Sequence, residues 1–195
     1  NHGIVEVFVP LIRHLQEEKA RGELKGIIIT SAKKAFLESG DLEYLYNNHD
    51  TAALFQAGQR LKEFFRDLER PGVPVVAAIN GDALGTGFEM ALACHHRIVL
   101  DDPKIRVGHP EVKIGLIPNG GAIIRLMWLL GIERTYPLLL EGRRYSPQEA
   151  LKVGIINELA SSRASTMEKS KRWCLANPDY HHPRDNPKKP TPGRT

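Results

Sequence analysis

One stretch of this sequence constrains the fold more than any other: an apolar run is followed by a glycine-rich segment and a second apolar run. Residues 73–79 are wholly apolar and rich in valine, which predicts a strand buried on both faces, as in a parallel sheet. Residues 88–94 are mostly apolar on all sides, which predicts a short buried helix. The glycines of residues 80–87 allow a tight turn and a close approach of the backbone to a ligand.

The rest of the chain continues this alternation of strands and helices. Alternation of this kind is typical of the α/β class, in which ligands bind at strand ends. A loop is expected over residues 31–41, and proline and charge from residue 177 onward indicate a linker or loose tail. The predicted helices span residues 4–21, 52–68, 88–94, 120–130 and 147–152, the last capped by Ser146, and the predicted strands span 27–29, 73–79, 97–100, 105–107 and 155–156.

Charge and composition exclude several classes of function. The chain has 27 Lys and Arg against 23 Asp and Glu, and much of the excess lies in the tail. Few aromatic side chains stand between these cations, so we expect no nucleic-acid partner, although a positive field suits a phosphate-bearing small molecule. The apolar runs are far shorter than the ~20 residues of a membrane span. No targeting signal is visible. Two distant cysteines, Cys94 and Cys174, fit a reducing compartment and buried positions.

The turn over residues 80–89 is the first candidate for chemistry. It leads from a predicted strand into a predicted helix, whose first N–H groups stabilise negative charge. A dinucleotide fingerprint is rejected, because no third glycine follows Gly85 and Gly87 at the required offset. Glu89 would lie half-buried in the first helical turn. It is either an acid/base group or a carboxylate that complements the helix dipole.

Two further segments carry candidates of the same kind. Glu111 follows Gly108 and Pro110 beside apolar residues, and it is either a functional acid or a plain loop carboxylate. Two acids in apolar settings are how acid/base pairs with separated pKa values are built. Gly40, after the strand at 27–29, offers an unobstructed N–H or is a simple turn glycine. The histidines beside Cys94 lack a recognisable metal-ligand spacing, so we expect structural or surface roles and no metal site.

Taken in order, these segments resemble the crotonase (enoyl-CoA hydratase/isomerase) superfamily. The resemblance covers about residues 1–160 and implies an α/β fold built as a spiral of ββα units, here truncated at both ends. A helical segment and a linker or tail over residues 161–195 would follow. The matching motifs are Ala-Phe-Leu-Glu-Ser-Gly-Asp-Leu at 35–42, Asn-Gly-Asp-Ala-Leu-Gly-Thr-Gly-Phe-Glu at 80–89, and Pro-Glu-Val-Lys-Ile-Gly-Leu-Ile-Pro-Asn-Gly-Gly at 110–121.

The resemblance also implies a reaction. It places an oxyanion hole for an acyl-CoA thioester on the N–H groups of Gly40 and Thr86, with Glu89 and Glu111 handling water and proton. Reversible hydration of a trans-2-enoyl-CoA to a 3-hydroxyacyl-CoA is the expected activity, with no cofactor beyond the coenzyme A of the substrate. Isomerisation, another crotonase-type reaction, or acyl-CoA binding without turnover are the alternatives. Contacts to the acyl-CoA are expected from Phe36, Ser39, Gly40, Leu42 and Gly85.

Some residues depart from the family pattern. Ser39 stands in place of a usual glycine and Glu38 in place of a small residue, so the pocket beside the presumed oxyanion hole is expected to differ in shape. Thr86 replaces the middle glycine of its motif but keeps the N–H.

The last residues resemble the linker of bifunctional fatty-acid β-oxidation proteins. In those proteins a hydratase domain precedes an NAD-dependent 3-hydroxyacyl-CoA dehydrogenase. The chain would then act as a homo-oligomer or as part of a larger β-oxidation polypeptide, in a bacterial cytoplasm or the mitochondrial matrix. The segments that carry this resemblance are residues 169–173, 177–179 and 192–193.

Overall fold

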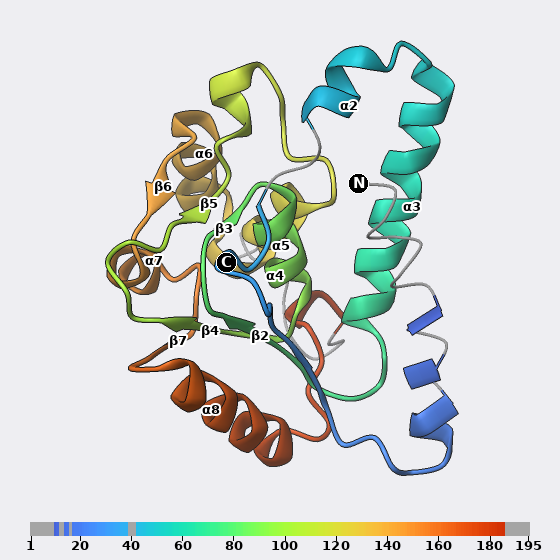
Figure 1. Cartoon of the computed structure of the whole chain (residues 1–195), viewed down its shortest axis with the longest axis vertical. Coiled ribbons are helices and arrows are strands. Elements are labelled where there is room, and N and C mark those ends of the chain that lie inside the picture. The colour runs from blue at the N-terminus through green and yellow to red at the C-terminus, as the bar shows by residue number, and fades with distance from the viewer. Residues whose placement is uncertain (1–9, 12–13, 16, 39–41, 186–195) are drawn as a thin grey trace.

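The computed structural model describes residues 10–11, 14–15, 17–38 and 42–185, and it contains two sheets (Figure 1). The larger sheet is parallel throughout. Ile27 lies opposite Val75, and Ile98 lies opposite both Ala78 and Glu158. Its strands, in spatial order, are β1 (Ile27–Ile29), β2 (Val75–Ile79), β4 (His96–Leu100) and β7 (Glu158–Ala160).

The smaller sheet joins β3 (Ala83–Leu84), β5 (Val107–Gly108) and β6 (Arg144–Tyr145). β3 and β5 pair in parallel, whereas β5 and β6 pair antiparallel. A strand of the large sheet, a strand of the small sheet and then a helix follow one another in β2, β3 and α4 (Thr86–Ala93). This is the ββα unit that the sequence motifs implied, and the predicted crotonase-like α/β fold is confirmed.

The large sheet separates two layers of side chains. Because successive strand residues point to opposite faces, Val75, Ala77 and Ile79 belong to the main core, which also contains α4. Val76 faces the other way and packs with Cys174 of α8 (Arg163–Ala176). Figure 1 shows α8 along one side of the sheet, with α4 and α5 (Ala122–Leu130) on the other.

The remaining helices surround this core. Asp50 caps α3 by accepting a hydrogen bond from the N–H of Ala53 at 3.0 Å. Ser146 caps α7, as the sequence predicted, and together with Glu149 it forms a complete capping box. These helices are α2 (Leu42–Asn47), α3 (Thr51–Glu69), α6 (Ile132–Glu141) and α7 (Pro147–Val153), with 3-10 turns at η1 (Glu111–Ile114) and η2 (Pro183–Asp185).

Several elements differ from the sequence prediction. The strand expected at residues 155–156 is wrong: both isoleucines are buried, but pairing begins later, in β7. Asn157 sets this register, because its Oδ1 accepts from the N–H of Arg97 at 2.9 Å and its own N–H donates to the Arg97 carbonyl at 3.0 Å. The sequence analysis gave no prediction for α2, β3, α6 or β6. In α6 the cap is Gly131, which has no side chain to signal the start, and Pro137 lies inside the helix.

Residues 177–185, where we expected a linker or tail, contact the core. Nε2 of His182 lies 3.0 Å from the carbonyl oxygen of Ala93, and Arg184 pairs with Glu69.

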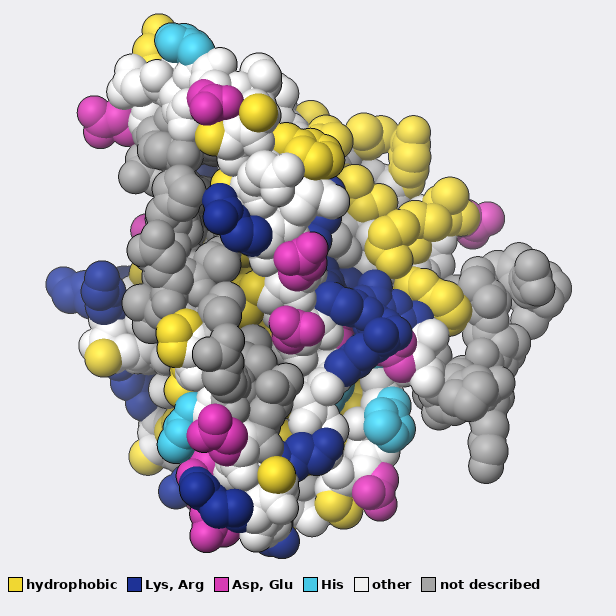
Figure 2. Space-filling model, turned by 90° about the vertical axis from the view of Figure 1, so that its right-hand side faces the viewer, with side chains coloured by type: hydrophobic (Ala, Val, Ile, Leu, Met, Phe, Trp, Pro, Cys, Tyr) yellow, Lys and Arg dark blue, Asp and Glu magenta, His cyan; other side chains and the backbone are white. Residues whose placement is uncertain are grey.

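Both cysteines are free and buried, as predicted. Across the described ranges, every helix is too short or too polar to cross a bilayer. On the face drawn in Figure 2, lysine and arginine side chains gather in one patch beside a band of hydrophobic ones.

Candidate active site

The first turn of α4 supplies exposed backbone donors. Gly85 precedes the helix with φ +55°, a left-handed conformation that favours glycine. Its N–H donates to the carbonyl of Gly108 at 3.0 Å, which ties the turn to β5. Thr86 is therefore the first helical residue, and first-turn N–H groups have no acceptor within their own helix. The Thr86 N–H therefore has no acceptor within α4, and its role as an oxyanion donor stays a prediction.

The segment leading toward Gly40 runs against this turn. The N–H of Leu84 donates to the carbonyl of Leu37 at 3.2 Å. A Cβ on Gly87 would lie only 1.8 Å from that same carbonyl oxygen. Glycine is required at position 87 because the two backbones touch.

The other predicted acyl-CoA contacts are described only in part. Phe36 is 6% exposed and belongs to the main core. Ser39 and Gly40 lie outside the described residues, so their predicted roles stay predictions. Leu42 is the first residue of α2.

Glu89 is buried and held by two amides from a distant loop. The side chain is 2% exposed, and its Oε1 accepts from the N–H of Gly120 at 2.7 Å and of Ala122 at 3.3 Å. Burial raises the pKa of this carboxyl above its ordinary value. The N–H groups of Ala122 and Gly120 oppose that shift, because they stabilise the charged form. The sequence analysis did not single out Gly120 as a partner of Glu89.

Glu111 approaches Glu89 from η1. Its side chain is 13% exposed, and its charge contributes to the raised pKa of Glu89, which places the two carboxyl groups near one another. Oε1 lies 3.3 Å from Nδ1 of His109. Oε2 is buried and has no hydrogen-bond partner among the described residues. The two acids that the sequence proposed as a pair are thus close enough for their charges to interact, and their catalytic roles stay predictions.

His109 is a site residue that the sequence reasoning missed. It is 4% exposed, and its ring centroid lies 5.3 Å from that of Phe88. Besides contacting Glu111, a charged His109 would lower the pKa of Glu89. Its Nε2 is buried without a partner in the described part of the chain. The sequence could have indicated this role, because His109 stands between Gly108 and Pro110, only two residues before Glu111.

The histidines beside Cys94 have structural roles. Nδ1 of His95 accepts from the N–H of Val75 at 2.9 Å, and its Nε2 lies 3.0 Å from the carbonyl of Glu69. His96 stacks on Trp173, with ring centroids 4.5 Å apart. In the described ranges, no group of three or more His, Cys, Asp or Glu residues is arranged to hold a metal ion.

The ββα unit of β2, β3 and α4, with the buried Glu89 in the first turns of α4, agrees with the crotonase-type protein that the sequence motifs resemble. The sequence model of the family described as enoyl-CoA hydratase/isomerase matches residues 6–177. The chain belongs to the enoyl-CoA hydratase/isomerase family.

Individual relatives agree with this assignment. The chain is 41% identical, over 159 residues, to the fatty acid oxidation complex subunit alpha of Shewanella frigidimarina, covering 79% of this chain and 22% of that protein. The Shewanella oneidensis protein of the same name is 40% identical over 149 residues, covering 74% of this chain and 21% of the relative. The chain thus spans about a fifth of the length of these curated relatives.

Solved structures show the same fold. An enoyl-CoA hydratase from Geobacillus kaustophilus superposes with a TM-score of 0.82 at 26% identity, covering 91% of this chain and 65% of that one. An enoyl-CoA hydratase from Bacillus anthracis gives a TM-score of 0.80 at 28% identity, covering 90% and 66%. The chain spans just under two thirds of these structures.

Proposed function

We propose that this chain catalyses the reversible hydration of trans-2-enoyl-CoA thioesters to 3-hydroxyacyl-CoA. Support for the proposal comes from two largely buried acids on separate elements, Glu89 on α4 and Glu111 on η1. His109 links their surroundings, because its ring contacts both Glu111 and Phe88, the neighbour of Glu89. Thr86 and Glu89 lie one helical turn apart, so one short segment offers both an N–H donor and an acid.

The chemistry needs both features. When the oxygen of water adds to the β-carbon, negative charge develops on the thioester oxygen, and each fixed N–H donor there is worth about 10²–10³ in rate. Thr86 supplies one such donor, and Gly40 is proposed for the second. One glutamate takes a proton from the attacking water and the other delivers a proton to the α-carbon. The two acids act as a coupled pair.

The names of the relatives favour a place for the chain in fatty-acid β-oxidation. We propose that it forms the hydratase part of a larger β-oxidation polypeptide, or acts as a homo-oligomer, in a bacterial cytoplasm or the mitochondrial matrix. The proposed reaction uses only side chains and amides of the protein with the coenzyme A of the substrate.

A hydration assay with crotonyl-CoA tests the activity. Glu89→Gln and Glu111→Gln should each lower kcat by about 10²–10⁴, the usual worth of general acid/base catalysis. Glu133→Gln, which changes an exposed glutamate on α6, is the matched control and should leave kcat unchanged. Circular dichroism checks that each variant folds. Folded wild-type protein without hydration activity, or a fully active Glu111→Gln variant, would contradict the proposal, and an isomerised product would favour the alternative reaction.

A further inference from the structure

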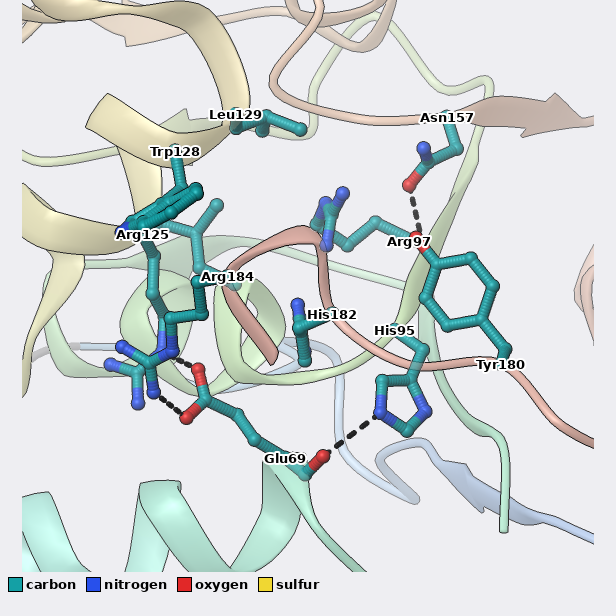
Figure 3. Close-up of a pocket in the computed structure, with 11 residues that line it drawn as sticks. Glu69, His95, Arg97, Arg125, Trp128, Leu129, Asn157, Tyr180, His182 and Arg184 are labelled. Atoms are coloured by element: carbon teal, nitrogen blue, oxygen red, sulfur yellow. Dashed lines mark hydrogen bonds and ion pairs between the residues drawn. The ribbon is translucent and has the colours of Figure 1, made fainter. Parts of the chain in front are cut away.

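Figure 3 shows a cavity lined by three arginine side chains. It has a volume of about 70 Å³ and is lined by residues from the end of α3, α4, the start of β4, α5, the turn before β7 and the segment after α8. None of the residues proposed for catalysis lines it. Its size suits a group of a few heavy atoms rather than a nucleotide or an acyl chain.

Arg97 is the most unusual group in this cavity. It is 3% exposed, and it donates from Nε to the carbonyl of Ile155 and from Nη1 to the carbonyl of Cys94, both at 3.0 Å. Within the described part of the chain, no ion pair joins it to a carboxylate. Figure 3 shows its side chain extending toward the middle of the cavity. Because arginine keeps its charge in proteins, the buried positive charge of Arg97 is balanced, as far as the described residues go, by carbonyl dipoles.

Arg184 adds an unused donor on the opposite wall. Its Nη2 pairs with Oε2 of Glu69, but its Nε is buried with no hydrogen-bond partner among the described residues. A buried donor left without an acceptor costs about 1–3 kcal/mol. An acceptor atom in the cavity would remove that cost.

The carboxylates around the cavity do not balance the arginines. Glu69, 3% exposed, accepts from Arg125 at 2.8 Å and from Arg66 at 2.7 Å in addition to Arg184. Asp185 is shared by two arginines. Four arginines, Arg66, Arg70, Arg125 and Arg184, thus share two carboxylates, and Arg97 pairs with neither. Among the described residues this leaves three positive charges in and behind the cavity wall, which Arg97, Arg125 and Arg184 line directly.

We propose that this cavity is a binding site for a dianionic phosphate group. Guanidinium groups bind phosphate oxygens through charge-assisted hydrogen bonds. A dianion offsets more of the excess positive charge than a carboxylate does, and it offers acceptors to both Arg97 and the free Nε of Arg184. The source is either inorganic phosphate or the terminal phosphate of a small organic ester, since both present the same oxygens. The site is independent of the proposed hydratase activity.

Isothermal titration calorimetry of the 195-residue chain tests the site. Inorganic phosphate and phenyl phosphate are titrated separately, at constant ionic strength set with chloride, and acetate serves as a monoanion. We expect phosphate to bind at one site and acetate at least about tenfold more weakly, because a charge-assisted hydrogen bond is worth about 1.5–3 kcal/mol. Binding of phenyl phosphate as tight as that of phosphate would indicate an ester as the source, and exclusion of phenyl phosphate would indicate the free ion.

Two variants locate the binding. Arg184→Gln should weaken phosphate binding about tenfold or more, while Glu69 keeps Arg66 and Arg125 as partners. Arg172→Gln changes an exposed arginine of α8 and should bind as the wild type does. Trp128 lines the cavity, so its fluorescence should respond to phosphate, and Trp128→Phe should lose that response. Absence of phosphate binding at equal ionic strength, or unchanged binding by folded Arg184→Gln, would overturn the proposal.

Discussion

The backbone N–H of Gly120 and the carboxylate of Glu89 are joined by a hydrogen bond of 2.7 Å, although 31 positions separate the two residues. Arg125 fixes the same loop from the other side, because its Nη1 donates to the Gly120 carbonyl at 2.7 Å. Its Nε binds Glu69 in the proposed phosphate site. One arginine thus supports the loop that holds a proposed catalytic acid and also forms part of a separate basic cavity.

Gly120→Ala should damage activity by displacing Glu89. A Cβ at this position would lie 2.7 Å from Oε2 of Glu89 and 2.6 Å from the ring of Phe65, so the carboxyl group must move. We expect kcat for crotonyl-CoA hydration to fall by about 10²-fold, as for misplacement of a catalytic group by an ångström. Gly115→Ala is the control, because nothing lies within 4 Å of its Cβ, although its φ of +73° adds some strain. Equal kcat in the two variants would speak against the positioning role of Gly120.

Gly87→Ala should destabilise the fold strongly. The new Cβ would meet the backbone carbonyl of Leu37 at 1.8 Å, and backbone cannot rotate away as a side chain can. We expect a loss of about 3 kcal/mol in the free energy of unfolding, at the upper end of overpacking effects. Gly58→Ala, on α3, meets nothing closer than 3.6 Å and should be neutral or stabilise by up to about 1 kcal/mol. Urea denaturation of both variants measures the difference.

Glu89 should make the protein less stable as pH rises. Burial raises the pKa of this carboxyl, so the folded state holds the proton more tightly than the unfolded state does. The stabilisation is therefore complete below the unfolded-state pKa and is lost as pH rises through the folded-state pKa. Glu89→Gln should remove this dependence and give a thermal midpoint at neutral pH equal to or above that of the wild type. A thermal midpoint well below the wild-type value would show that the charged carboxylate is itself needed for folding.

His182 should make the protein less stable as pH falls, which is opposite to the effect of Glu89. Burial, helped by the nearby His95, lowers the pKa of His182 from 6.5 to about 4. The folded state thus favours the neutral ring, and stability is lost as pH falls from 6.5 toward 4. The total loss in the free energy of unfolding is about 3 kcal/mol once pH lies below both pKa values. His182→Gln keeps a donor for the Ala93 carbonyl and should show a smaller loss over this range, which thermal unfolding at several pH values measures. Parallel pH curves for variant and wild type would rule out this role.

His109 should position Glu111 during turnover. Its Nδ1 lies 3.3 Å from Oε1 of Glu111. His109→Leu removes this contact and should lower kcat about tenfold with little change in KM, because a hydrogen bond to a charged group is worth about 1.5–3 kcal/mol. His109→Gln, which retains an N–H donor, should recover part of the rate. If both variants retain wild-type kcat, the histidine only fills space beside Phe88.

Local patterns predicted the elements whose signal lies within a few residues. The sequence predicted the β-branched run of β1, the apolar run of β2 and the Ser146 cap of α7, because propensity, burial and capping act over short distances. Short elements such as β3 and β6 carry too few residues for a periodicity, and they exist because partner strands complete their hydrogen bonds.

The sequence by itself determined the class of fold, because its ordered motifs resemble those of the crotonase superfamily, and it singled out Glu89 and Glu111 as candidate acids. It could not show that Gly120 and Ala122 hold Glu89, that His109 contacts Glu111, or that Arg97 and Arg184 face one cavity. The contacts of Glu89 and of the two arginines join residues from separate elements, and the packing of α4, α5, β4 and the segment after α8 decides them. The contact of His109 with Glu111 depends on how the backbone turns into η1. Hydrogen bonding and burial of charge depend on distances in space, which spacing along the chain does not fix.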